Sequence, residues 1–453
     1  MVTRLLPAAL AAALLAAPAA ADNWPQWRGP KNDGHAAGTV PTEWGPDKNV
    51  VWKAKLPGRG SSTPVIWKDK IFFTSLDTAP AGPGVSLLCY GTDGVEKWKA
   101  PLGPSGKSGR GDEGNDASAS CSTDGKHVWA FAGNGKLACF DFDGQEKWSL
   151  DVQKYGKFGI QFGIHWTPVL YKDKLFLQVM HRNAQKLVAL DAATGRELWK
   201  VERPGYGKGE SPDTYSSAFV WEGPNGQALL IAHGNDYCTG HRLDTGEEVW
   251  RVADLNPTSN GAWRFVSCPL VTPDLIVVPS CKNGPTVAFN PSGAKGTINE
   301  DNPAELWRFK ETPDVVSPLR IGNIVYLLKD GPLMAVDAKT GKQIYRQTLP
   351  VQQIYRGNMV YADGKIVIVG RDGLGIVVQA GPEYKVLAVN DLSIDGKKPT
   401  VYASPVIVDG RLYIRTGEHL YCFGQKAAAV GTTSGWRSDW LRCILPGTPR
   451  DPS

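Results

Sequence analysis

The stretch 187-LVALDAATGRELWK-200 decides the fold of this chain, because its pattern returns several times along the sequence. Residues 187–192 alternate small and large apolar side chains over the length of one strand, and residues 197–201 have the composition of a second strand. Thr194 and Gly195 stand between them, and glycine takes a positive φ in a tight turn at no steric cost. The stretch is therefore predicted to form a β-hairpin.

Copies of this hairpin keep a turn glycine and place an aromatic residue four positions after it. The turn glycines are Gly94, Gly144, Gly195, Gly246 and Gly341. Tyr345 replaces tryptophan in the last of these copies. A large flat ring at a fixed place buries much surface at little conformational cost, so these rings are predicted to dock one repeat on another. The tryptophans predicted to dock the repeats are Trp52, Trp98, Trp148, Trp199, Trp250 and Trp307.

A second pattern precedes each hairpin: a serine or threonine near a proline, followed by two short apolar stretches. Clear examples are 61-SSTPVIWKDKIFF-73, 165-HWTPVLYKDKLFL-177 and 402-YASPVIVDGRLYI-414. Eight such pairs of short strands, A and B, can be counted, and the hairpin adds strands C and D. The docking tryptophans are 46, 50, 51, 51 and 57 residues apart. Four short strands in ~40–50 residues are typical of a β-propeller blade.

The two ends of the repeat region complement each other. The last repeat, 402–424, stops after strand C, whereas 49-NVVWKAKL-56 has the form of a strand D with no strand C before it. We therefore predict an all-β, eight-bladed propeller of four-stranded antiparallel blades, closed by the N-terminal strand, which removes an open sheet edge. The predicted divisions are a signal peptide (1–21), a lead-in (22–48), the propeller (49–424) and a loose tail (425–453).

With these motifs the chain resembles the pyrroloquinoline quinone (PQQ) repeat propellers, which have eight blades. Their tryptophan-docking motif is matched in full by Ala189, Asp191, Thr194, Gly195 and Trp199. The stretch 23-NWPQWRGPKNDG-34 is also similar to the lead-in of such proteins, and the resemblance spans about residues 23–424. It implies the fold and leaves the activity open, because these tryptophans are structural in the family.

The first 21 residues have the features of an export signal. Arg4 precedes the apolar stretch 5–18, and small residues lead up to Ala21. The apolar stretch is too short for a membrane span, and no cysteine near the cleavage point could accept a lipid. We expect a periplasmic or extracellular protein that is soluble, is not a lipoprotein and has no membrane span. A net charge of +5 over 453 residues argues against nucleic-acid binding.

The cysteines are predicted to be mostly packed thiols. Cys89, Cys139 and Cys422 occupy the alanine position of the docking motif. No C-x-x-C pair occurs, which argues against a zinc site, and no metal ligand is assigned.

The resemblance implies two kinds of function. Quinoprotein dehydrogenases hold PQQ and calcium in the central funnel and oxidise alcohols or sugars, whereas BamB-type propellers are non-catalytic scaffolds of outer-membrane barrel assembly. The enzymes often carry two adjacent cysteines, which this chain lacks, and BamB-type proteins are usually lipoproteins. We predict a non-catalytic binding or scaffold protein of the cell envelope with a protein or peptide partner and no assigned catalytic residue. A PQQ- and calcium-dependent oxidoreductase and a carbohydrate-binding module are the alternatives.

One candidate site emerges from the loops that enter the innermost strands, because in a propeller these loops converge on one mouth of the channel. Seven consecutive repeats carry an ionisable residue there, with nearly alternating signs, and several have an aromatic neighbour such as Tyr215 or Tyr402. Such a rim suits a peptide, a glycan or a small polar ligand, although the charges could simply neutralise one another. The predicted rim is Arg59, Asp116, His165, Asp213, Arg264, Asp314 and Arg356.

Overall fold

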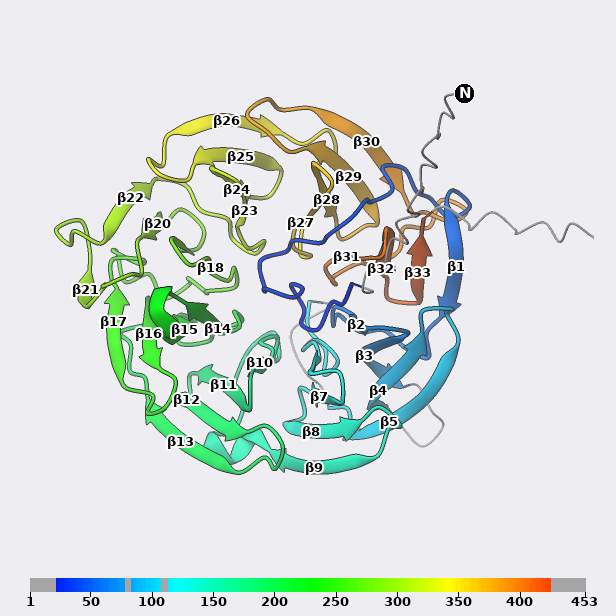
Figure 1. Cartoon of the computed structure of the whole chain (residues 1–453), viewed down its shortest axis with the longest axis horizontal. Coiled ribbons are helices and arrows are strands. Elements are labelled where there is room, and N and C mark those ends of the chain that lie inside the picture. Colours follow the sequence, from blue (N-terminus) through cyan, green and yellow to red (C-terminus); the bar gives the residue numbers. More distant parts are fainter. Residues whose placement is uncertain (1–21, 78–82, 107–112, 425–453) are drawn as a thin grey trace, which may run out of the picture.

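The computed structural model describes residues 22–77, 83–106 and 113–424. The predicted signal peptide (1–21) and tail (425–453) lie outside the described residues. Eight sheets stand around a central axis and form a closed ring (Figure 1). The predicted all-β, eight-bladed propeller is therefore confirmed.

Each blade has four antiparallel strands, with strand A nearest the axis and strand D at the outer edge (Figure 1). Blades 1 and 2 are β2 (Val65–Trp67), β3 (Lys70–Asp77), β4 (Gly84–Gly91) and β5 (Glu96–Pro104), then β6 (Ser122–Thr123), β7 (His127–Phe131), β8 (Lys136–Asp141) and β9 (Glu146–Asp151). Blades 3 and 4 are β10 (Val169–Tyr171), β11 (Lys174–His181), β12 (Ala184–Asp191) and β13 (Glu197–Glu202), then β14 (Phe219–Glu222), β15 (Ala228–Gly234), β16 (Tyr237–Arg242) and β17 (Glu248–Val252).

The second half of the ring repeats this order. Blades 5 and 6 are β18 (Leu270–Val271), β19 (Ile276–Pro279), β20 (Thr286–Phe289) and β22 (Glu305–Phe309), then β23 (Leu319–Ile321), β24 (Ile324–Leu328), β25 (Pro332–Asp337) and β26 (Gln343–Thr348). Blades 7 and 8 are β27 (Val360–Ala362), β28 (Lys365–Val369), β29 (Leu374–Gln379) and β30 (Val386–Asp391), then β31 (Val406–Val408), β32 (Arg411–Arg415), β33 (His419–Phe423) and β1 (Val50–Lys55).

The N-terminal strand closes the ring as predicted. β1 runs antiparallel to β33, with Trp52 opposite Cys422. Figure 1 shows this strand, drawn in blue, as the outer strand of the last blade, drawn in red. The chain thus joins its first strand to its last sheet, and neither is left with an unpaired edge at this junction.

Regular structure other than the blade strands is sparse. Among the described residues, two short 3-10 helices occur, η1 (Val152–Tyr155) and η2 (Pro224–Gly226). One further strand, β21 (Gly296–Ile298), pairs in parallel with β17 and extends blade 4 to five strands, which the sequence pattern did not predict. In the described part of the chain, no helix is long and apolar enough to cross a membrane.

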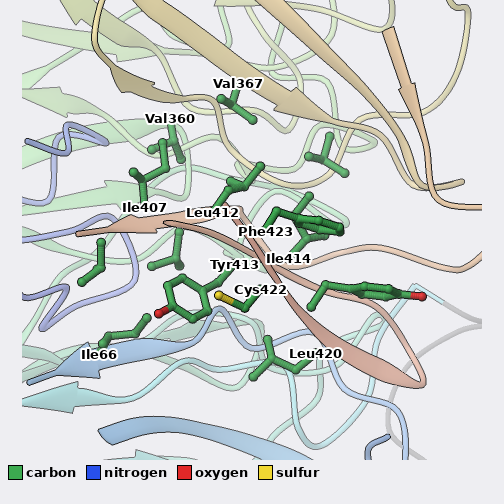
Figure 2. Packing of buried hydrophobic residues seen from close by; sticks show 14 of the residues in the cluster. Ile66, Val360, Val367, Ile407, Leu412, Tyr413, Ile414, Leu420, Cys422 and Phe423 are labelled. Atoms are coloured by element: carbon green, nitrogen blue, oxygen red, sulfur yellow. The ribbon is translucent and has the colours of Figure 1, made fainter. Parts of the chain in front are cut away.

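The core lies between the blades, because both faces of each sheet are covered by a neighbour. In β12, Leu187 and Ala189 pack toward blade 4, whereas Val188 and Leu190 pack toward blade 2. This alternation explains why the strand is apolar at every position. Figure 2 shows part of the cluster around blade 8, which also takes in Ile66 from blade 1.

The tryptophans at the outer edge join successive blades. The ring of Trp148 in blade 2 covers Gly195 in the turn of blade 3, where a Cβ atom would come within 2.6 Å of the ring. The same arrangement pairs Trp52 with Gly94, Trp98 with Gly144, Trp199 with Gly246, and Trp307 with Gly341. Each of these five indole N–H groups donates to a backbone carbonyl near that turn, at 2.8 to 3.0 Å. We call these five pairs the outer belt.

The docking motif therefore has a physical reason at each position. The small residue lies directly opposite the tryptophan, as Ala189 lies opposite Trp199 and Cys139 opposite Trp148. The carboxylate of Asp191 accepts hydrogen bonds from the backbone N–H and the hydroxyl of Thr194 and so fixes the turn. The cysteines at this position are buried, and the seven cysteines within the described ranges are all free thiols.

Trp250 departs from the outer belt. It is buried, at 1% exposure, but its indole N–H has no hydrogen-bond partner in the described structure. The segment that would supply a turn glycine in blade 5 instead forms β21, in which Gly296 pairs with Trp250 on β17. The ring packs against Gly240 on its own blade and Phe289 on the next.

Candidate ligand-binding cavity

A cavity of about 360 Å³ lies on the axis of the ring, between the innermost strands. Eight of its lining residues come one from each blade, just before strand A. We call these residues the inner ring. They are Thr63, Ser120, Thr167, Ser217, Cys268, Ser317, Asn358 and Ser404.

The inner ring is closed by hydrogen bonds that pass from blade to blade. The backbone N–H of each member donates to the side-chain oxygen or sulfur of the member in the next blade, at 2.7 to 3.2 Å. The last bond runs from the N–H of Ser404 to the hydroxyl of Thr63 and completes the circle. The serine or threonine that precedes proline in the motif therefore links two blades: its side-chain oxygen accepts from one blade and its backbone N–H donates to the next. The following proline has no N–H and does not compete for these acceptors.

The floor of the cavity is formed by the lead-in. Figure 1 shows this segment, in dark blue, crossing the centre of the ring. Trp24 pairs with Ile66 in blade 1, Trp27 lies against Phe219 in blade 4 at 6.2 Å between ring centroids, and His35 bridges to the backbone of blade 7. These contacts fall on or beside strand A, after the inner ring, so the floor and the predicted rim lie at opposite ends of the cavity.

Arg28 stands in this floor and is almost entirely buried, at 2% exposure. Its Nη2 donates to the carbonyl of Pro318 at 2.8 Å, but Nε and Nη1 have no partner among the described residues. Burial lowers the pKa of this guanidinium, and interactions with Cys268 and Asp33 oppose that shift. A buried cation with unused donors therefore lies next to the lining residues Trp27 and Ser317, although Arg28 itself does not line the cavity.

The mouth of the cavity carries four of the seven predicted rim residues. His165, Arg264, Asp314 and Arg356 come from four different blades and line the same space. Lys282 lines it as well, and its backbone N–H donates to the carboxylate of Asp314 at 3.0 Å. These loops are far apart in the sequence and come together because the ring of blades is closed.

The other three predicted rim residues have local contacts and do not line the cavity. Arg59 is exposed. The carboxylate of Asp116 is buried and accepts from the hydroxyl of Ser105 and the N–H of Gly106. Asp213 is fully buried and pairs with Arg182.

Glu113 is a mouth residue that the sequence pattern missed. It forms a two-pronged ion pair with Arg356, at 2.9 and 3.1 Å, and also binds Arg371 at 3.0 Å. These bonds join the loop before blade 2 to blade 7 across part of the mouth. Glu113 stands three residues before the predicted Asp116 in the same loop, so the loop was found but the wrong acid was chosen.

Aromatic rings gather on one side of the mouth. Phe162 and His165 both lie edge-on to Tyr215, at 6.0 and 5.7 Å between centroids. Arg264 lies over the ring of Phe162 and forms an ion pair with Glu210 at 2.6 Å. Burial lowers the pKa of His165, against the opposing effect of the hydrogen bond that its Nε2 donates to the carbonyl of Phe162. The cavity thus combines an aromatic wall, fixed charges and a polar ring, and it is suited to holding a polar ligand.

The residues of the cavity do not fit calcium and PQQ. Calcium takes six to eight oxygen ligands, commonly several carboxylates, but no group of three acidic, histidine or cysteine side chains is arranged to hold a metal in the described part of the chain. Of the two acids that line the cavity, Glu113 is paired with two arginines and Asp314 with a backbone N–H. No adjacent cysteine pair exists to cover a cofactor ring.

Two parts of the repeat region match the model of a known protein family. The model of a family described as outer membrane protein assembly factor BamB matches residues 88–201 and 294–381. No curated protein sequence matches the chain.

Solved structures share the fold at low sequence identity. BamB from Moraxella catarrhalis has a TM-score of 0.58 and 13% identity, over 83% of this chain and 99% of that one. Quinohemoprotein alcohol dehydrogenase from Comamonas testosteroni has a TM-score of 0.60 and 14% identity, over 95% of this chain and 83% of that one. The computationally designed Ika8 protein has a TM-score of 0.51 and 13% identity, over 82% of this chain and 99% of that one.

Likeness at this level establishes the fold and not the activity. The repeat motif, the family match within the repeats and the shared fold agree on one conclusion: the chain is an eight-bladed β-propeller built from PQQ-like repeats.

Proposed function

We propose that the chain is an exported, non-catalytic binding protein of the cell envelope, which captures a protein or peptide partner at the mouth of its central cavity. One observation carries the proposal: four ionisable residues from four blades converge beside an aromatic wall, at the open end of a cavity whose other end is closed by the lead-in. Export is proposed from the leader-like sequence of residues 1–21.

Recognition explains the charged mouth better than stability does. Ion pairs that remain partly exposed contribute only about 0–1 kcal/mol each, and both Arg264 and Glu113 keep about a quarter of their side-chain surface exposed. Oxidation through PQQ is the weaker candidate, because the acids of the mouth are engaged by arginines and a backbone N–H and form no calcium cage.

The test compares one arginine and one aspartate of the mouth with one arginine and one aspartate elsewhere on the protein. The full mature chain and an Arg264→Ala/Asp314→Asn variant are immobilised, and proteins captured from a detergent extract of envelopes are identified. The control is Arg320→Ala/Asp274→Asn, which removes an ion pair between blades 5 and 6 on the outside of the cavity. We expect the wild type and the control to retain the same partner and the mouth variant to lose it.

A second measurement separates scaffold from enzyme. The purified protein is incubated with PQQ and calcium, and quinone absorbance and dye reduction are followed with a panel of alcohols and sugars. Stoichiometric uptake with turnover would overturn the proposal in favour of an oxidoreductase. Equal capture by wild type and mouth variant would show that the partner binds somewhere other than the cavity.

A further inference from the structure

The inner ring offers hydroxyl hydrogen-bond donors to the cavity. Six members carry a hydroxyl group: Thr63, Ser120, Thr167, Ser217, Ser317 and Ser404. Each hydroxyl oxygen already accepts a backbone N–H from the preceding blade. Each group is at most 5% exposed. The hydroxyl of Ser317 also interacts with the thiol of Cys268, which is only a weak acceptor, and no donation to a carbonyl or carboxylate is seen from any of the six in the described ranges.

The direction of the free protons follows from this arrangement. A hydroxyl has one proton to donate, and a buried donor without a partner costs free energy. Because these side chains line the cavity, the space on the axis is where their protons can find an acceptor. The inner ring therefore presents six O–H donors, one from each of six blades, to whatever occupies the cavity.

The charges around the cavity favour a negative group. Its lining includes three cationic side chains, Arg264, Lys282 and Arg356, against two acids, Glu113 and Asp314. Arg264 and Arg356 are paired with Glu210 and Glu113, so the excess positive charge of the lining comes from Lys282. Below the inner ring, the guanidinium of Arg28 is buried with two nitrogen atoms unpartnered, and its acidic neighbour Asp33 is itself paired with His35 at 3.3 Å. An ionised carboxylate accepts hydrogen bonds only and carries a negative charge. It therefore matches both the hydroxyl donors of the inner ring and the positive charges around the cavity.

The shape of the cavity favours the carboxylate at a chain end over a side-chain carboxylate within a loop. The lead-in crosses the centre of the ring (Figure 1), and its Trp27 lines the cavity, while the ion pairs of Glu113 span part of the mouth. A loop of a partner would have to enter and leave by the same restricted opening, whereas a chain end needs only to enter. We propose that the inner ring seats the C-terminal carboxylate of the peptide or protein partner. This inference rests on the proposed function and names the chemical group that the site recognises.

The experiment uses peptides whose C-terminus is either free or blocked. A library of octapeptides with randomised sequence is prepared with free C-terminal carboxylates and, separately, with C-terminal amides. Both are passed over the immobilised full mature chain, and retained peptides are identified by mass spectrometry. We expect retention of the free acids. The amide of the best peptide should bind at least about tenfold more weakly by fluorescence anisotropy, since a hydrogen bond to a charged group is worth roughly that factor or more.

Two serine variants provide a matched pair. Ser317→Ala removes a donor from the inner ring, whereas Ser267→Ala removes a buried hydroxyl that donates to the carbonyl of Val316 and does not line the cavity. We expect Ser317→Ala to weaken the free-acid peptide about tenfold and Ser267→Ala to leave its affinity unchanged. The comparison of free-acid with amide peptides uses the wild-type protein only. It therefore tests the inference even if a serine variant folds poorly.

The possible outcomes separate this inference from the proposed function. Equal binding of acid and amide would overturn the carboxylate seat and leave peptide capture standing. Retention of an oligosaccharide of glucuronic acid, with no retention of either peptide library, would overturn both the C-terminal source and the protein partner. Retention of neither peptides nor saccharide would overturn the inference, and envelope capture would then decide the proposed function alone.

Discussion

The outer belt and the inner ring each repeat around the molecule and each join one blade to the next, but they use different groups. In the outer belt, a tryptophan covers a glycine and its N–H is consumed by a carbonyl, as with Trp148 and Gly195. In the inner ring, a backbone N–H is satisfied by a hydroxyl whose own proton remains, as with Ser120 and Thr167. The belt holds the ring together through apolar contact, and the hydrogen-bond donors of its indole rings are all used within the protein. The inner ring, in contrast, keeps hydroxyl donors that face the cavity. We therefore expect stability to depend mainly on the edge, and the recognition that we propose is placed at the axis.

The largest effect is expected from opening the outer edge. Deleting the mature N-terminus through Leu56 removes β1, exposes the edge of β33 and leaves Gly94 without the ring of Trp52. It also removes the floor of the cavity. An exposed strand edge promotes aggregation, and we expect loss of cooperative unfolding in thermal melts followed by light scattering. A truncated protein that unfolds like the wild type would show that closure contributes little.

A direct comparison of belt with inner ring comes next. Trp148→Ala should lower the free energy of unfolding by an amount near the lower end of the about 3–5 kcal/mol that truncating a fully buried large aromatic residue costs, because Trp148 is partly buried. Ser317→Ala leaves the N–H of Cys268 without its acceptor and should cost about 1–3 kcal/mol. Urea denaturation measures both, with Tyr206→Ala as a control because this side chain is 72% exposed. Equal losses for Trp148→Ala and Ser317→Ala would contradict the assignment of stability to the edge.

Alanine substitutions at two glycines test how much the contact between ring and glycine contributes to stability, with a smaller expected effect. Gly195 and Gly293 both have positive φ, at 72° and 80°, so alanine is strained at either position. A Cβ atom at Gly195 would lie 2.6 Å from the ring of Trp148, whereas nothing lies within 4 Å of one at Gly293. We expect Gly195→Ala to be more destabilising than Gly293→Ala by about 1–3 kcal/mol, the usual cost of overpacking. Equal losses would mean that the turn conformation matters and the ring contact does not.

The last prediction concerns pH and a buried histidine, whose replacement should change the stability little at pH 7 and more in acid. Burial, helped by the charge of Arg203, lowers the pKa of His233 on β15 to about 3. The unfolded chain binds a proton below its ordinary pKa of about 6.5, and the folded chain does not until the pH nears 3. The stabilisation is therefore complete above about pH 6.5 and is lost as the pH falls, by up to about 1.4 kcal/mol per pH unit.

Replacing His233 isolates this contribution. The free energy of unfolding of His233→Phe should fall less steeply with decreasing pH than that of the wild type, while both proteins should show the same slope above pH 7. The slopes come from urea titrations at several pH values. A variant whose slope below pH 6 equals that of the wild type would show that His233 is not held neutral in the fold.

Much of the fold could be predicted from local pattern alone. The hairpin around Gly195 depends on turn chemistry within a few residues, and the spacing of the tryptophans gave the blade period and the closing role of residues 49–56. The exception at Trp250 shows the limit of this reasoning. Its spacing from Gly246 fits the motif, yet the segment after β20 forms β21 and takes the place of the expected glycine turn. That outcome depends on a pairing between blades that no local pattern records.

The candidate site was predicted only in part. The loops that converge on the mouth could be named because a closed ring requires it, and four of the seven chosen side chains line the cavity. Asp116 and Asp213 instead bind groups in their own surroundings, because a buried carboxylate needs partners and found them nearby. Whether a loop side chain turns toward the axis or back into its blade is decided by such competition, which sequence spacing does not report.

The sequence by itself determined the repeat, the number of blades and the strand that closes the ring, since these follow from strand period, turn residues and the need to pair every edge. The tertiary structure alone decided that the lead-in closes the floor, that Glu113 spans the mouth to Arg356, and that eight residues from eight blades form one hydrogen-bonded circle. The physical reason is the same in each case. Contacts within a blade are fixed by neighbours in sequence, whereas the cavity is built from residues up to hundreds of positions apart that meet only once the ring has closed.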